Sequence, residues 1–295
     1  MRFVTFRSEH GDSVGVVVGD QVADLSHPAC VSLLGCRVPS LLAMVEDGLD
    51  RWTQRLGNPM PSESLRPLGG LRLLAPLRPG KIVGAAFNFT DALAERKMEP
   101  PAEPVTFVRS GSTVIGPDEP ILIPPDVGNV GYEAELAVVI GRRALRVSAE
   151  EAMRHVAGYT AHNDVSGSDL IRGDGANFVR GKNLPASAPL GPWLATPDEV
   201  ANPYALSVRL DVDGRPLQDG STATMIFRIA QLISFISHRM PLDPGDVIAT
   251  GTPAGVAAMH QPPGWLRPGS TVTVEVQGFG RLRNPILQGE PFLDR

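Results

Sequence analysis

The chain has 295 residues, of which 42% are hydrophobic and 20% charged, and its formal net charge is -5. This composition is typical of a soluble globular protein, and the lack of a lysine- or arginine-rich block argues against nucleic acid or an anionic membrane as a partner. The N-terminus has no apolar signal-peptide stretch, and no apolar run approaches the roughly 20 residues that span a bilayer. Cys30 and Cys36 lack zinc-site spacing, so we expect a reduced, cytoplasmic protein.

Residues 1–75 are expected to form a small N-terminal β/α domain. Short apolar runs bounded by turn residues predict three strands, at 3–6, 13–18 and 21–25. A helical stretch is expected over 31–47. Residues 56–80 are rich in Gly, Pro and Leu, which places the domain boundary near residue 75 and leaves 76–295 as a larger second domain.

The larger domain is expected to be rich in short strands. Apolar runs predict strands at 81–86, 105–109, 132–140, 158–164, 206–213, 246–250 and 271–276. Capping and periodicity signals predict helices at 91–98, 148–155 and 222–238, the last being the longest amphipathic helix. So many short strands argue against a regular βαβ architecture. The predicted fold class is mostly β, of the α+β type.

Two acidic residues stand out at the start of the predicted strand 132–140. Glu133 and Glu135 are two residues apart, so their side chains share one face of the strand and repel each other unless a cation lies between them. Asp164, at the end of the strand 158–164, supplies a third carboxylate. Three carboxylates suit a hard divalent cation such as Mg²⁺, Mn²⁺ or Ca²⁺. The alternative is an ordinary solvated strand face, because exposed glutamate is common.

Several segments occur in a fixed order through most of residues 81–286. They include KIVGAAFNFTDALAE (81–95), YEAELAVVIGR (132–142), AGYTAHNDVSGSD (157–169), RGKN (180–183), PLGPW (189–193) and LDPGDVIATGTPAGV (242–256). Together they resemble the fumarylacetoacetate hydrolase family. The resemblance implies a mixed β-roll, usually assembled as a homodimer, with a divalent metal in a cleft. Members of this family cleave, decarboxylate or isomerise small 2-oxo acids, so such an acid is the expected substrate.

The resemblance assigns roles to the acidic cluster and to one lysine. Glu133, Glu135 and Asp164 match the metal ligands of the family. We expect Mg²⁺ or Mn²⁺, with Ca²⁺ as a further candidate, because no sulfur or histidine ligand is implied. Lys182 matches a lysine that stabilises an enolate or holds the substrate. Without the resemblance, Lys182 reads equally well as an exposed surface cation.

The resemblance also suggests a group of substrate-binding residues. Gly251 and Thr252 match a loop that receives the substrate carboxylate, although the same loop reads as a simple turn. Gln218, in the segment DGRPLQ (213–218), matches a glutamine on the substrate side. Exposed glutamine is common, so this match is less specific than the others.

The lid segment departs from the family pattern. The family reads N-Y-x-x-H-x-x-E, in which the histidine and the glutamate activate a water molecule. Here Ala92 replaces the histidine, and Glu95 remains as the candidate general base without its partner. Removing such a group typically costs about 10²–10⁴-fold in rate. Ser168 also replaces an arginine that often follows the N-D motif. His162 is close to the site in sequence, but we expect it to have a structural role.

The favoured function is that of a metal-dependent enzyme acting on a 2-oxo acid or 1,3-dicarbonyl compound through a metal-stabilised enolate. By family frequency, the first choice is hydrolysis of a C–C bond in an acylpyruvate-like compound. The alternatives on the same metal site are decarboxylation, tautomerisation, isomerisation and a biosynthetic cyclisation. A third alternative is a non-catalytic scaffold that keeps the metal but has lost the reaction.

Overall fold

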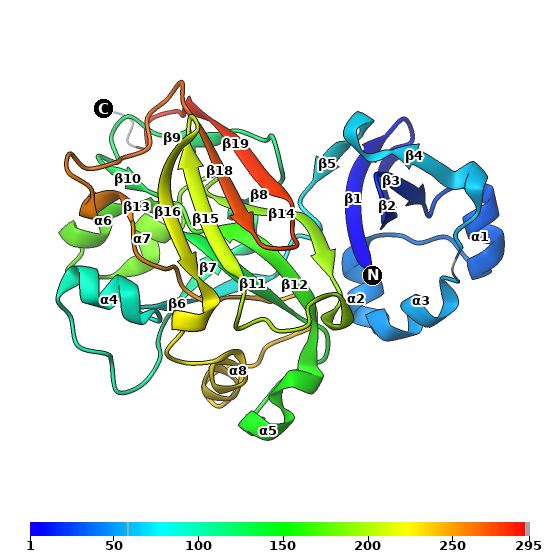
Figure 1. The fold of residues 1–295 in the computed structure, drawn as a ribbon, viewed down its shortest axis with the longest axis horizontal. Coiled ribbons are helices and arrows are strands. Elements are labelled where there is room, and N and C mark those ends of the chain that lie inside the picture. The colour runs from blue at the N-terminus through cyan, green and yellow to red at the C-terminus, as the bar shows by residue number, and fades with distance from the viewer. Residues whose placement is uncertain (58, 293–295) are drawn as a thin grey trace.

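The computed structural model describes residues 1–57 and 59–292, and Figure 1 shows the fold. The N-terminal part contains β1 (Arg2–Ser8), β2 (Gly11–Val18), β3 (Gln21–Asp24), β4 (Leu65–Pro67), β5 (Arg72–Leu74), α1 (Pro28–Leu34), α2 (Leu41–Asp47) and α3 (Leu49–Arg55). The single helical stretch expected over 31–47 is therefore wrong. Gly35 ends α1 in the left-handed region at φ 70°, and α2 begins only after its own cap, Ser40.

The main sheet joins this N-terminal part to the rest of the molecule. Its strands lie in the order β4-β3-β2-β1-β14-β12-β11-β17-β6-β7. The strands beyond β1 are β14 (Ala188–Ala195), β12 (Val156–Asn163), β11 (Ala134–Ile140), β17 (Val247–Ala249), β6 (Lys81–Ala86) and β7 (Val105–Ser110). The link is the antiparallel pair β1–β14, in which Phe3 faces Leu194. The two parts thus share hydrogen bonds, and the boundary near residue 75 stays a prediction.

A second sheet packs against the centre of the first (Figure 1). It runs in the order β16 (Arg215–Ser221), β15 (Ser207–Val212), β18 (Thr271–Val276), β19 (Arg281–Gln288) and β9 (Ile121–Ile123). Short strands complete the fold: β8 (Val114–Ile115), β10 (Val130–Gly131) and β13 (Ser166–Gly167). Leu136 of β11 shares one buried apolar cluster with Val208 of β15 and Val274 of β18. The architecture confirms the predicted mostly β, α+β class and the mixed β-roll.

The remaining helices are short and lie around the sheets. They are α4 (Thr90–Arg96), α5 (Ala149–Ala152), α6 (Ser168–Gly173), α7 (Phe178–Lys182) and α8 (Ile229–Ser237). The helix expected over 222–238 begins only at Ile229, because the side chain of Asn88 pairs with both the N–H and the carbonyl of Phe227 and holds that segment extended. Within residues 1–57 and 59–292, we find no helix that combines the length and the hydrophobicity needed to cross a membrane.

The apolar side of α8 is used within the chain itself. Ile229, Leu232, Ile233 and Ile236 are all buried in the central core. The apolar residues that suggested assembly are thus accounted for mainly by packing within the chain. The homodimer implied by the family resemblance stays a prediction.

Asn88 gives a first test, because it ties three segments together. Its Nδ2 donates to the carbonyl of Thr250 at 2.8 Å and to that of Phe227 at 3.1 Å, and its Oδ1 accepts from the Phe227 N–H at 2.7 Å. Because these groups are buried, Asn88→Ala should lower the free energy of unfolding by about 2–4 kcal/mol, measured by urea denaturation. The control is Asn202→Ala, an exposed site with one local hydrogen bond. Equal midpoints for the two variants would contradict this role.

Candidate active site

The three predicted carboxylates meet where β11 begins and β12 ends. The register pairs Ala134 with Asn163, so Glu133 and Asp164 are neighbours just outside the ladder. The Asp164 N–H donates to the Glu133 carbonyl at 2.8 Å. One carboxylate oxygen each from Glu133, Glu135 and Asp164 lies within 4.8 Å of the others. The structure therefore brings together the three residues that the sequence predicted.

Two cations hold this cluster together. The Nζ of Lys182 lies 2.7 Å from Glu133 Oε2 and 2.6 Å from Asp164 Oδ2, and Lys182 is only 3% exposed. Arg109 is fully buried and pairs with the other Asp164 oxygen, while its guanidinium also donates to the carbonyl and hydroxyl of Ser187 at 2.7 and 2.6 Å. The surface interpretation of Lys182 is thus wrong.

Arg109 was missed by the sequence reasoning. It lies in β7, inside the run VTFVRS, which was assigned only as a strand. One feature of the sequence could have indicated its importance: Arg109 is a lone charge in a strand, next to small and apolar residues. A buried charge must be paired, and β7 runs beside β6, which leads into the lid segment. Its partner, Asp164, is 55 residues away in the sequence.

The charges of the cluster are unevenly compensated. Burial raises the pKa of Glu135 well above its usual value, and the Asp164 and Glu133 charges raise it further. Burial also opposes ionisation of Asp164, but Lys182 and Arg109 outweigh burial and hold the pKa of Asp164 at about 2. Three carboxylates thus face two cations. These oxygen donors suit a hard divalent cation, and each carboxylate keeps lone pairs for one, since an ionised carboxylate offers about four acceptor sites.

Glu135 is oriented by the loop that follows β17. Its Oε2 accepts a hydrogen bond from the Gly251 N–H at 3.0 Å. Gly251 has φ +98°, and a Cβ there would come within 2.9 Å of the Ala85 carbonyl oxygen, so only glycine fits without strain. The N–H that was predicted to receive the substrate carboxylate is therefore directed at a candidate metal ligand.

Thr252 and Gln218 form one hydrogen-bonded unit. Thr252 Oγ1 donates to the Ala134 carbonyl at 2.9 Å and accepts from Gln218 Nε2 at 2.8 Å. Gln218 Oε1 accepts from the Ala134 N–H at 2.9 Å. Thr252 lines the cavity described next, whereas Gln218 is buried behind it. Gln218 thus holds the loop against β11, and its contact with substrate stays a prediction.

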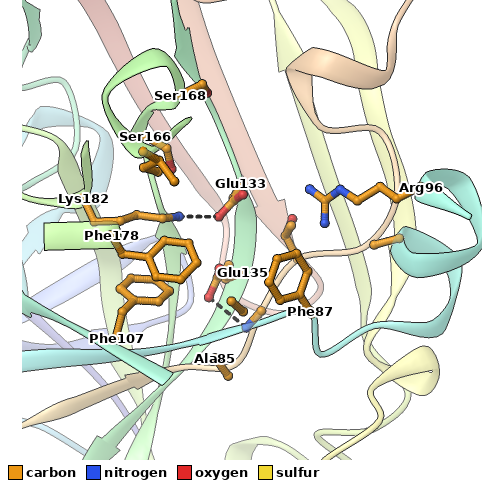
Figure 2. A pocket seen from close by; sticks show the side chains of 15 residues that line it. Ala85, Phe87, Arg96, Phe107, Glu133, Glu135, Ser166, Ser168, Phe178 and Lys182 are labelled. Carbon is orange, nitrogen blue, oxygen red and sulfur yellow. Dashed lines mark hydrogen bonds and ion pairs between the residues drawn. The ribbon is translucent and has the colours of Figure 1, made fainter. Parts of the chain in front are cut away.

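A cavity of about 240 Å³ opens beside the carboxylates. Aromatic rings line two sides of it: Figure 2 shows Phe107 and Phe178 next to Lys182, and Phe87 across the cavity, next to Arg96. The rings of Phe107 and Phe178 stack at 5.0 Å between centroids, and Lys182 Nζ lies 4.8 Å from the Phe107 centroid. The other lining residues are Ala85, Ala86, Ala92, Arg96, Glu133, Glu135, Ser166, Ser168, Ile171, Gly251 and Thr252. A small polar molecule would here contact both charge and an apolar wall.

Only some residues of the lid helix α4 line this cavity. Ala92 lines the cavity and is 2% exposed. Glu95 is exposed, and its carboxylate accepts from the Gly255 N–H at 3.0 Å. His162 is fully buried outside the cavity lining; its Nδ1 lies 2.8 Å from the Pro189 carbonyl oxygen, and burial lowers its pKa to about 4. The geometry accords with a structural role for His162.

Comparison with known proteins gives the same family as the motifs. The family model described as "Fumarylacetoacetate (FAA) hydrolase C-terminal" matches residues 81–287. The chain belongs to the fumarylacetoacetate hydrolase family. Its similarity to "Oxaloacetate tautomerase fahd2, mitochondrial" of Xenopus laevis is 35% identity over 293 residues, which covers 97% of this chain and 90% of that protein.

Solved structures of the family show the same fold. Fumarylacetoacetate hydrolase from Exiguobacterium antarcticum is 30% identical, with a TM-score of 0.84, over 98% of this chain and 100% of that chain. A 2-hydroxyhepta-2,4-diene-1,7-dioate isomerase from Mycobacterium marinum is 31% identical, with a TM-score of 0.76, over 98% of each chain. These relatives are enzymes with different reactions, and this chain is an enzyme of their family rather than a scaffold.

The carboxylate cluster predicts a metal-binding phenotype for Glu135→Ala. Loss of one of three ligands should abolish tight binding of Mg²⁺ or Mn²⁺ in calorimetry and remove the metal-dependent rise in Tm. Glu103→Gln is the matched control, because Glu103 is exposed and distant in sequence from the cluster. Unchanged affinity in Glu135→Ala would show that the cation binds elsewhere.

Proposed function

We propose that this enzyme catalyses metal-dependent enolisation of a 2-oxo acid, interconverting its keto and enol forms. The main support for this proposal is that Lys182 and three carboxylates meet beside the cavity. Among the residues described, the lining of this cavity includes no histidine. Enolisation breaks a C–H bond at C3 and forms an O–H bond at the 2-oxo oxygen, with solvent water accepting and returning the proton, so the main requirement is stabilisation of the negative charge that develops on that oxygen. Enolisation does not need an activated water molecule as a nucleophile. The histidine that activates such a water in the family is replaced here by Ala92.

Glu133, Glu135 and Asp164 would hold the metal, and we propose Mg²⁺ or Mn²⁺ because the donors are all oxygen atoms. When bound, the ion supplies a Lewis acid that polarises the 2-oxo group and favours loss of a proton from the adjacent carbon.

Lys182 supplies a second positive charge on the chain itself. Burial opposes its charge, but Asp164 and Glu133 outweigh burial and raise its pKa, which keeps the amine protonated. An ammonium group has three N–H donors. Two of them are directed at Glu133 and Asp164, which leaves one for a substrate oxygen in the cavity. Such a fixed donor stabilises negative charge that develops on an enolate oxygen.

The walls of the cavity support this chemistry. The stacked pair Phe107 and Phe178 limits water around Lys182, and electrostatic interactions are stronger in a less polar environment. Gly251 and Thr252 both line the cavity, and the N–H of Gly251 is directed at the Glu135 carboxylate. We retain Thr252 as a proposed substrate contact.

C–C bond hydrolysis is the second candidate, supported by the presence of Glu95 on α4. Its side chain is exposed and accepts from the Gly255 N–H, so it does not face the cavity in this arrangement. A movement of the lid would be needed before Glu95 could act as a general base on water. The geometry therefore supports enolisation more directly than hydrolysis.

Proton exchange tests the proposal. The Mg²⁺-loaded enzyme should exchange the C3 protons of oxaloacetate or pyruvate with D₂O faster than buffer does, as followed by NMR. Lys182→Met should lower the catalysed rate by about 10²–10³-fold, the usual effect of losing one oxyanion donor, while Lys97→Gln, outside the cavity lining, should not. Absence of exchange across a panel of 2-oxo acids would overturn the proposed function.

Ala92→His separates enolisation from hydrolysis. Ala92 is buried at the cavity wall, so an imidazole there would enter the site. If the enzyme is a hydrolase lacking one acid–base group, hydrolysis of an acylpyruvate should rise tenfold or more, within the roughly 10²–10⁴ range for such groups. We expect the opposite result: enolisation should fall because the ring fills the cavity, and hydrolysis should not appear. If Ala92→His shows the same rates as the wild type in both reactions, residue 92 does not lie at the cavity wall.

A further inference from the structure

Arg96 is a cavity-lining cation that the proposed function leaves without a role. It is the last residue of α4, and its half-buried guanidinium points from the lid toward Glu133 (Figure 2). Lys182 forms ion pairs with two carboxylates. Within the described part of the chain, by contrast, Arg96 forms neither an ion pair nor a hydrogen bond. Its guanidinium lies over the Phe87 ring, whose centroid is 5.9 Å from Cζ.

The backbone on both sides keeps the guanidinium at the cavity. Lys97 ends α4 in the left-handed region at φ 54°, so the chain leaves the cavity immediately after Arg96. Phe87 has φ 60°, a conformation that is unfavourable for a bulky residue. This strained residue brings an aromatic ring to the cavity wall beneath Arg96. An arginine stacked on an aromatic ring keeps its in-plane donors free for a ligand.

The charges indicate which ligand would suit Arg96. The three carboxylates exceed Lys182 and Arg109 by one negative charge, so a bound divalent cation would leave the cluster with one positive charge. Arg96 adds a second positive charge at the opposite side of the same cavity. A ligand with two separated negative groups matches this arrangement, and a planar guanidinium binds a carboxylate through two parallel hydrogen bonds.

We infer that Arg96 receives the second carboxylate of a small 2-oxo dicarboxylic acid, whose 2-oxo carboxylate end lies at the Glu133–Glu135–Asp164 cluster. This assignment rests on the proposed function for the identity of the 2-oxo end. It makes Arg96 a specificity-determining residue, and it predicts that a monocarboxylate of the same length is a poor ligand. Because Phe107 lies beside Lys182 and Phe87 beside Arg96, the carbon chain of the substrate would contact these two rings.

Binding measurements on the Mn²⁺-loaded protein test Arg96 without relying on turnover. The matched ligands are 2-oxoglutarate and 2-oxopentanoate, which have the same five-carbon chain and differ in the distal carboxylate. The wild type should bind 2-oxoglutarate more tightly, and Arg96→Gln should lose roughly 10- to 100-fold in affinity for it, the range of a charge-assisted pair. Affinity for 2-oxopentanoate should stay within about threefold.

Two controls show whether Arg96 acts on the ligand or on the cluster. Oxalate is short enough to occupy the metal alone, so its affinity should be the same in wild type and Arg96→Gln. Lys97→Gln removes the adjacent positive charge, which does not line the cavity, and should leave all affinities unchanged. An equal loss for oxalate and 2-oxoglutarate in Arg96→Gln would mean that Arg96 merely balances Glu133, and would overturn the inference.

Activity then separates this inference from the proposed function. Enolisation of oxaloacetate should lose 10- to 100-fold in kcat/KM in Arg96→Gln, mainly through KM, while enolisation of its 4-methyl ester should change little. A binding preference for the diacid without any enolisation would retain Arg96 as the carboxylate receptor and reject the proposed function. If the wild type binds 2-oxoglutarate and 2-oxopentanoate with equal affinity, or binds neither of them, the role of Arg96 is overturned.

Discussion

The need to balance three clustered carboxylates, two of them buried, dominates this structure. Ionised side chains lose several kcal/mol of hydration free energy on burial and are retained only where cations and hydrogen bonds replace water. Asp164 is the centre of that arrangement, since Arg109 contacts one of its oxygens and Lys182 the other. Among the described residues, Glu135 forms no ion pair, and its carboxylate accepts a hydrogen bond from the Gly251 N–H. The excess of one negative charge would favour binding of a cation, as we propose for this site.

Several backbone features serve this balance. The register of β11 and β12 places Glu133 next to Asp164. Helix α7 must approach β13 closely to bring Lys182 into the cluster, and Gly181 permits this approach, because a Cβ there would lie 2.6 Å from the Gly167 carbonyl oxygen. These constraints lie in segments far apart in the sequence. The mixed β-roll is what allows them to converge, because its core fixes the strands whose ends carry the charged groups.

Features of this molecule that depend on residues close in sequence were easier to predict than features that depend on distant residues. Local periodicity and turn signals predicted about half of the strands and placed Glu133 and Glu135 on one face, whereas the family resemblance favoured their convergence with Asp164 over an ordinary solvated strand face. Long-range pairing was harder to predict. The helix expected over 222–238 is shortened by Asn88, about 140 residues earlier, and Arg109 has no local motif that announces its partnership with Asp164. Glu95 and Gln218 were placed by resemblance, yet their hydrogen bonds go to Gly255 and to the Thr252 loop.

The lid helix illustrates how a conserved scaffold can present different chemistry. Residues 92 and 96 are one helical turn apart and both line the cavity, whereas Glu95, between them, points to the Gly255 loop. With alanine at 92, the cavity side of α4 carries no acid–base group and ends instead in a guanidinium. In the proposed function, a lid of this kind would contribute charge recognition through Arg96, and stabilisation of the enolate would come from Lys182 and the metal-binding carboxylates. If the lid binds the substrate carboxylate and the residues at the strand ends stabilise the enolate, the same fold can support proton transfer between carbon and oxygen without a water-activating dyad.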